Sequence, residues 1–240
     1  MRAIEVDGMS SSGAWLVRSR RPGGMEDIPM PAPRRSRRRP LTRSSAKRSP
    51  TRKSGTVYRV LVTLRDTRPA IWRRVLVPGD ILLGRLHHVI QAAMGWRESH
   101  LHMFHVGGRQ FSNPRFRFED GYDGKVGDEA LLTLDRSTLG GKRAIDYEYD
   151  LGDPWKHNIG IEKVLGPGEA PRRVPACIAG AGACPPENVG GAPGYEQFLW
   201  ALAHPNHKEH EHFLEWTGGP FDPERFDLTE ADRRVRTACR

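Results

Sequence analysis

One stretch, residues 145–161, constrains the fold more than any other part of the chain, because it reads as a β-hairpin. Apolar and acidic side chains alternate from Ile145 to Leu151, and apolar side chains recur at every second position from Trp155. A period of two is typical of a half-buried strand. Gly-Asp-Pro at 152–154 separates the two runs. We therefore expect two antiparallel strands joined by a turn.

The register of this hairpin follows from the faces of its strands. A two-residue loop would set Tyr149 opposite Lys156 and mix the apolar and polar faces, whereas a three-residue loop at 152–154 keeps the faces apart. The expected pairs are Leu151 with Trp155, Tyr149 with His157, Tyr147 with Ile159, and Ile145 with Ile161. The opposite face then carries Asp146, Glu148 and Asp150, with Lys156 across from Asp150.

The segments before the hairpin predict two strands, a helix and a third strand. The strands are expected at 57–64, 71–77 and 101–106, and helical spacing of apolar residues covers 83–94. Gly95 suits the position after the helix. This ββαβ order resembles the opening of a β-grasp fold.

The segments after the hairpin predict a loop and then helices. Residues 175–191 are rich in Pro and Gly, which favour an irregular loop over a helix or a central strand. Three short helices are expected to close the chain. The fold class is therefore α+β, with a mixed or antiparallel sheet, a central β-hairpin and a C-terminal cluster of short helices.

The positive charge of the chain is concentrated at its N-terminus. The net charge is +9; residues 1–53 hold 14 Lys+Arg against 4 Asp+Glu, and residues 54–240 hold the other 24 against 25. Low apolar content and high charge predict a disordered basic arm over 1–55, followed by one α+β domain over 56–238. The basic residues of the arm are Arg34, Arg35, Arg37, Arg38, Arg39, Arg43, Lys47, Arg48, Arg52 and Lys53.

Clustered Lys and Arg displace counterions from phosphates, so the arm predicts contact with nucleic acid. A solvated tail, or a segment translated only if Met1 is the true start, would have the same composition.

No apolar run approaches the roughly 20 residues that span a bilayer, so no membrane contact is expected. Three cysteines, an odd number, fit a reducing compartment, and we expect a cytoplasmic protein.

Two groups of side chains are candidates for chemistry. The first group is histidines: His100 and His102 share one face of their expected strand, and His157 lies on the hairpin. The second group is the acidic ladder, which is the row Asp146, Glu148 and Asp150 on one face of the hairpin. Neighbouring carboxylates of this ladder would lie about 6.5–7 Å apart, a separation that suits acid–base chemistry or a cation. Histidines at the edge of a core and a plain solvent face are the structural alternatives. The candidate functional cluster is His100, His102, Asp146, Glu148, Asp150 and His157.

A third group is Cys177 and Cys184, which suggest zinc because thiolates are zinc ligands. The six residues between them exceed the usual spacing of structural zinc sites. Buried cysteines that pack the Pro/Gly-rich loop are the alternative.

Several stretches together resemble the plasmid pRiA4b ORF-3-like family over about residues 58–235. They are Pro69-Ala-Ile-Trp-Arg-Arg-Val, Leu86-His87, Ala93-Met94-Gly95-Trp96, Ser99-His100-Leu101-His102, Tyr147-Glu-Tyr-Asp-Leu-Gly-Asp, Cys184-Pro-Pro-Glu-Asn-Val-Gly-Gly, Gly194-Tyr195-Glu196 and Phe221-Asp222-Pro223. The resemblance implies an α+β domain found in plasmids and insertion elements. Some members carry a resolvase name, but this chain has no recombinase-type nucleophilic serine or helix-turn-helix pattern.

These observations lead to two hypotheses from different classes. The first is a non-enzymatic binding or accessory protein tied to mobile DNA, which contacts nucleic acid or a protein partner. The alternative is a metal-dependent, hydrolase-like enzyme that uses the His/Asp/Glu cluster. Metal analysis of protein purified without a histidine tag separates the two.

Overall fold

A computed structural model describes residues 55–116, 126–139, 141, 143–166 and 168–238. The basic residues of the arm lie outside this range, so disorder and nucleic-acid contact there stay predictions. The strands are β1 (Val57–Leu64), β2 (Ile71–Pro78), β3 (His102–Val106), β4 (Arg109–Ser112), β5 (Gly127–Asp128), β6 (Ala144–Tyr149), β7 (Trp155–Leu165) and β8 (Ala176–Ala181). The helices are α1 (Leu83–Met94), the 3-10 helix η1 (Glu129–Leu131), α2 (Leu134–Ser137), α3 (Gly191–Ala203), α4 (His210–Thr217) and α5 (Leu228–Ala238).

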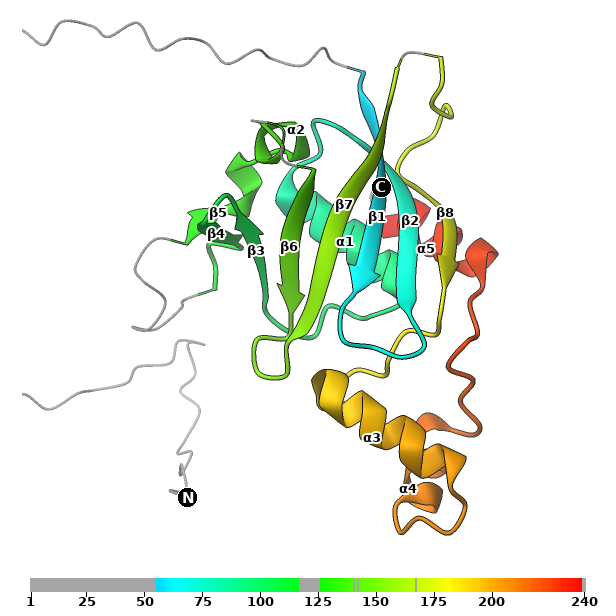
Figure 1. The fold of residues 1–240 in the computed structure, drawn as a ribbon. Helices are drawn as coiled ribbons and strands as arrows, with labels where there is room; N and C mark the ends of the chain where they lie inside the picture. Colours follow the sequence, from blue (N-terminus) through cyan, green and yellow to red (C-terminus); the bar gives the residue numbers. More distant parts are fainter. Residues whose placement is uncertain (1–54, 117–125, 140, 142, 167, 239–240) are drawn as a thin grey trace, which may run out of the picture. The chain divides into compact units, whose positions relative to one another are not determined.

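The strands form one mixed eight-stranded sheet in the order β5-β4-β3-β6-β7-β1-β2-β8. The β4–β5 pair is parallel and the other neighbours are antiparallel. The hairpin β6–β7 therefore lies in the middle of the sheet, between β3 and β1 (Figure 1). The α+β class, the ββαβ opening, the central hairpin and the C-terminal helices are confirmed.

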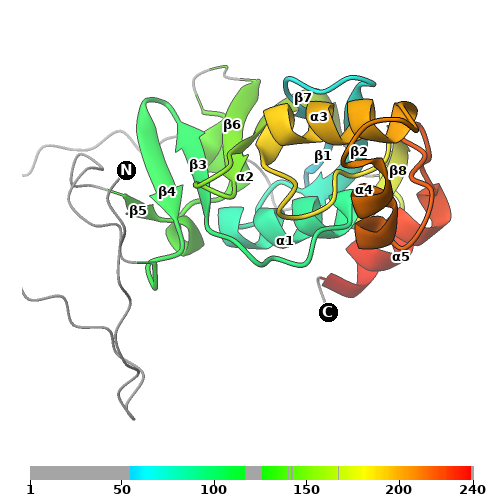
Figure 2. The ribbon, with the colours of Figure 1, turned by 90° about the horizontal axis from the view of Figure 1, so that it is seen from below.

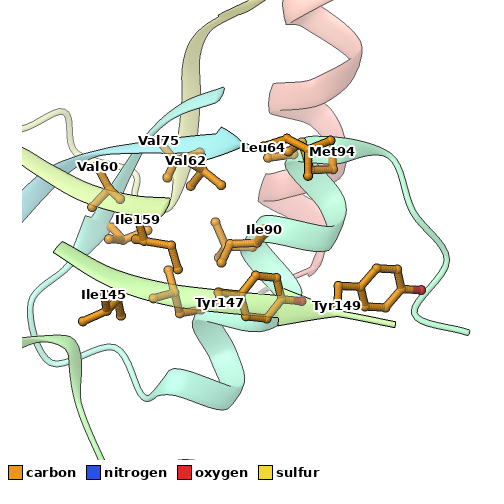
Figure 3. Packing of buried hydrophobic residues seen from close by; sticks show 14 of the residues in the cluster. Val60, Val62, Leu64, Val75, Ile90, Met94, Ile145, Tyr147, Tyr149 and Ile159 are labelled. Atoms are coloured by element: carbon orange, nitrogen blue, oxygen red, sulfur yellow. The ribbon is translucent and has the colours of Figure 1, made fainter. Parts of the chain in front are cut away.

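The core lies between the sheet and α1, which runs along one face of it (Figure 2). The spacing of Leu83, Leu86 and Ile90 puts these buried side chains on one side of α1. Figure 3 shows Ile90 and Met94 among apolar side chains of the sheet. The burial of each such aliphatic side chain contributes about 1.5–3 kcal/mol to the stability of the fold. Gly95 ends the helix with φ 111°, as its sequence position predicts.

The expected register of the hairpin is wrong by two residues. Tyr149 pairs with Trp155 and Tyr147 with His157, so the loop is longer than three residues. Asp150 supplies the positive φ, 63°, that Pro154 is unable to adopt. A shift of two residues preserves the side-chain faces, and the apolar face of β6 is buried as expected. Asp150, however, lies in the turn, and Lys156 pairs with Glu148.

The expected irregular loop over 175–191 is wrong in its first part, where β8 forms. β8 is at the edge of the sheet and pairs with β2 alone. An edge strand makes ladder bonds on one side only, so a Gly- and Ala-rich segment is tolerated there. No helix in the described part of the chain has the length and apolar character required to cross a membrane.

Candidate functional site

A buried polar cluster lies between α1, β3 and η1. The rings of His87 and His102 are stacked, with centroids 3.6 Å apart and planes 12° apart. His102 Nε2 lies 2.6 Å from Glu129 Oε2, and all three side chains are buried. The other ring nitrogen of His102, Nδ1, is buried and has no partner in the described part of the chain. Buried polar groups of this kind are costly unless paired, so the cluster is a candidate site.

Gly84 of α1 makes room for the Glu129 carboxylate. A Cβ at this position would lie 3.0 Å from Glu129 Oε1. The absence of a side chain therefore lets the carboxylate pack against the helix and reach His102.

His87 is held as a neutral imidazole. Its Nδ1 lies 2.8 Å from the Tyr147 hydroxyl, which also accepts a hydrogen bond from Gln91 Nε2. Burial, with smaller contributions from His102 and His88, lowers the pKa of His87 to about 2. When Nδ1–H donates to the Tyr147 oxygen, Nε2 keeps a free lone pair.

His87, the next residue His88, and Glu98 converge at the end of this cluster. One ligand atom from each lies within 4.8 Å of the other two. His88 Nδ1 and Glu98 Oε1 are 2.8 Å apart, and these two side chains are each 40% exposed. The group thus joins one buried imidazole to two side chains that solvent can reach.

Glu98 is presented by a strained and well-anchored loop. Its φ of 60° lies in the left-handed region, which non-glycine residues seldom adopt. Both neighbours are fixed through backbone N–H groups: Arg97 donates to Glu187 Oε1 at 3.1 Å, and Ser99 donates to the Tyr149 hydroxyl at 2.9 Å. Tyr149 in turn donates to Glu187 at 2.6 Å. These contacts hold the conformation that aims Glu98 at the two histidines.

The chemistry of the three side chains suits a transition metal. Two imidazoles and one carboxylate are the protein ligands of many catalytic zinc sites, with a fourth position for water. The same set binds iron(II) in oxygenases. The Tyr147 hydroxyl behind His87 corresponds to the hydrogen-bond partner that metal-bound histidines usually have.

The six residues of the candidate functional cluster do not come together. His102 joins Glu129 rather than the acidic ladder. His100 Nδ1 lies 3.6 Å from Asp150 Oδ2, and Asp150 also accepts hydrogen bonds from the backbone N–H groups of the turn.

The ladder itself is reduced to Asp146 and Glu148, on the sheet face opposite to His87 and His102. Asp146 is paired with Arg65, and Glu148 Oε2 lies 3.4 Å from His105 Nε2. These contacts are typical of the polar face of an antiparallel sheet.

His157 and Cys177 are buried in the core, and Cys184 is partly buried against it. His157 Nδ1–H donates to the Trp155 carbonyl, and burial lowers the pKa of His157 to about 3. Cys177 and Cys184 are free thiols, and burial raises the pKa of both, that of Cys184 to about 12. In the described residues, neither cysteine belongs to a group of three potential metal ligands.

Sequence reasoning missed His87, His88, Glu98, Glu129 and Glu187. One signal was available, because a histidine at position 87 interrupts the apolar stripe of α1 next to Leu86. Glu98 comes from the loop after α1 and Glu129 from the 3-10 helix η1, and no spacing in the sequence links them to α1.

Comparisons with known proteins match most of this chain to one sequence family. The family model described as plasmid pRiA4b ORF-3-like protein matches residues 56–230. The uncharacterized protein y4hQ of Sinorhizobium fredii (strain NBRC 101917 / NGR234) is 41% identical over 180 residues, which are 75% of this chain and 90% of that protein. The crystal structure of MM3350 from Methanosarcina mazei Go1, a protein of unknown function, has a TM-score of 0.65 and 34% identity, and the match covers 73% of this chain and 96% of that one.

Proposed function

The chain belongs to the plasmid pRiA4b ORF-3-like family, and from this premise we propose that it is a metal-dependent enzyme of the hydrolase class. The observation that carries the proposal is the convergence of His87, His88 and Glu98 within 4.8 Å. The metal is a divalent transition metal such as zinc, with His87 as the buried ligand and the other two at the surface.

The ligand set explains why hydrolysis is the favoured reaction. Three protein ligands leave one position of a tetrahedral zinc ion for water, and zinc lowers the pKa of bound water to about 7. The 40% exposure of His88 and Glu98 lets water and substrate reach that position. A purely structural zinc site would have four protein ligands, and the described residues offer three.

Metal content and affinity test the proposal. Full-length protein purified without a histidine tag is analysed for metals, stripped with a chelator and titrated with Zn²⁺. We expect about one metal per chain and a loss of affinity of about 100-fold or more in His88→Ala and in Glu98→Gln. Both side chains are half-exposed, so the variants keep the fold.

His212→Ala on α4 is the matched control, since it removes an exposed histidine that is outside the group of three. It should bind metal like the unchanged protein. Equal affinity in all four proteins, or no binding at all, would contradict the proposal.

A second candidate function is nucleic-acid contact through residues 34–53. The support is the charge of the sequence, since this segment has ten basic residues and no acid. An accessory role in mobile-DNA settings belongs to this candidate. Affinity for duplex DNA should fall steeply with salt and vanish when 34–53 is deleted; binding that is insensitive to salt would count against it.

A further inference from the structure

We propose that the substrates of the centre formed by His87, His88 and Glu98 are phosphodiesters of nucleic acid. This inference rests on the metal-dependent function proposed above and adds the class of substrate. Three observations support it: the access to the centre, the cations beside it, and the charge of the chain outside the domain.

The centre is open rather than enclosed. The side chains of His88 and Glu98 are each 40% exposed, whereas His87 is buried behind them. A metal held by these residues would lie near the surface of the described domain. A polymer can therefore present one of its bonds to the centre without entering a cavity.

Two arginines lie close to the ligands along the chain. Arg85 precedes His88 by one turn of α1, so the two side chains are neighbours on the helix surface. Arg97 directly precedes Glu98 in the anchored loop. Both residues are exposed, and neither guanidinium has a hydrogen-bond or ion-pair partner in the described residues.

Unpaired guanidinium groups on residues that neighbour metal ligands favour a phosphate over a neutral ester or amide. Arginine binds two phosphate oxygens at once, and this geometry orients the group as well as attracting it. Arginine clamps also stabilise the charge on phosphoryl oxygens in the transition state.

The chain's charge outside the domain favours a polyanion over a small phosphate ester. Ten basic residues and no acid lie between 34 and 53, while residues 54–240 are nearly neutral. Such a segment raises the local concentration of nucleic acid by contacts with its backbone and needs no base-specific contact.

The reaction is the addition of water across one P–O ester bond. A water oxygen forms the new bond to phosphorus, and the bond from phosphorus to the leaving alcohol oxygen breaks. One water proton ends on the leaving alcohol and the other stays on the new phosphomonoester or passes to solvent. No oxidant, reductant or further co-reactant is needed.

Hydrolysis by the zinc-loaded full-length protein tests the inference. The probes are bis(p-nitrophenyl) phosphate as a diester, p-nitrophenyl phosphate as a monoester, p-nitrophenyl acetate as a carboxylic ester, and supercoiled plasmid DNA. We expect the diester to be cleaved with the highest kcat/KM of the three small probes, and the plasmid to be nicked. Arg85→Ala with Arg97→Ala should lower kcat/KM for the diester about tenfold or more, with zinc affinity unchanged.

Arg225→Ala is the matched control. It removes an exposed arginine of the loop before α5, and its guanidinium has no hydrogen-bond or ion-pair partner among the described residues. It should cleave the diester like the unchanged protein. Zinc binding with cleavage of the acetate alone would overturn the substrate class and leave the metal-dependent function standing. Failure to bind zinc would overturn both, and full diester activity in the double arginine variant would overturn the role of the two arginines.

Discussion

Tyr149 of β6 donates a hydrogen bond of 2.6 Å to Glu187, which lies 38 residues later in the loop after β8. The same hydroxyl accepts the N–H of Ser99, so one side chain joins the sheet to two loops. Burial, followed by the contact with Glu187, raises the pKa of Tyr149. The tyrosine therefore stays protonated and remains a donor.

Tyr149→Phe should destabilise the fold by about 1.5–3 kcal/mol, the range for hydrogen bonds to charged groups. It should also weaken zinc binding, because Ser99 loses the contact that helps to fix Glu98. Urea denaturation and zinc titration measure the two effects. Unchanged zinc affinity in the folded variant would show that the loop does not need this anchor.

Tyr195→Phe is the control for that substitution. The Tyr195 hydroxyl is buried and has no hydrogen-bond partner in the described residues. Its removal should change the free energy of unfolding by less than about 0.5 kcal/mol, or raise it slightly, because a buried unpaired polar group is lost.

Arg73→Met should destabilise the protein by about 3 kcal/mol or more. Arg73 is buried and donates to four backbone carbonyls, those of Trp72, Ala93, Ala181 and Gly182. These carbonyls belong to β2, the end of α1, β8 and the residue after β8. Methionine keeps the apolar stem but removes all four of these hydrogen bonds.

Arg73→Lys separates charge from geometry. Lysine keeps the charge but lacks the planar fork of donors. We therefore expect the stability of Arg73→Lys to lie between that of the native protein and that of Arg73→Met. Denaturant midpoints provide the comparison. A methionine variant within 1 kcal/mol of the native protein would contradict this account of Arg73.

Gly84→Ala should destabilise the protein, although alanine favours helices by about 1 kcal/mol over glycine. The new Cβ would lie 3.0 Å from Glu129 Oε1. Glu129 is buried and hydrogen-bonded to His102, so moving its carboxylate aside would disturb that contact. Overpacking costs typically 1–3 kcal/mol, and we expect a net loss of about 1 kcal/mol by thermal denaturation. A gain in stability would show that the Glu129 carboxylate moves aside at little cost.

Acid should destabilise the fold through His157. Burial lowers its pKa in the folded chain to about 3 from a usual value of 6.5. Between these values the unfolded chain binds a proton that the folded chain does not, so the free energy of unfolding falls as pH falls below about 6.5. The slope from this residue is about 1.4 kcal/mol per pH unit.

His157→Phe should remove that part of the pH dependence. Between pH 7 and pH 5 the native protein should lose about 2 kcal/mol more than the variant, as measured by urea denaturation at each pH. Parallel curves for the two proteins would mean that His157 is not the group responsible.

The sequence predicted those parts of the fold that depend on periodic patterns. The alternation in β6 identified its buried face, since only one face can be apolar. The predicted register of the hairpin was wrong because the length of the turn depends on a backbone conformation, the positive φ of Asp150. The alternation of side chains does not encode this conformation. β8 was missed because its tolerance of Gly and Ala depends on its place at the edge of the sheet.

The candidate site was harder to predict for a related reason. His102 was identified as a site residue, but its partners were expected among His157 and the carboxylates of the hairpin. Its actual partner, Glu129, comes from a segment outside that hairpin. Contacts between separate elements depend on how those elements pack, and the periodic pattern of a single sequence does not encode them.

The position of the hairpin β6–β7 has a consequence for folding during synthesis. β1 pairs with β7, and β3 pairs with β6, so the middle of the sheet is filled by segments made late. Until Leu165 has left the ribosome, both β1 and β3 have an unpaired edge. Such edges are prone to wrong pairing, and distant strand contacts form slowly. The nascent chain should therefore need protection by chaperones until the hairpin inserts and closes the gap.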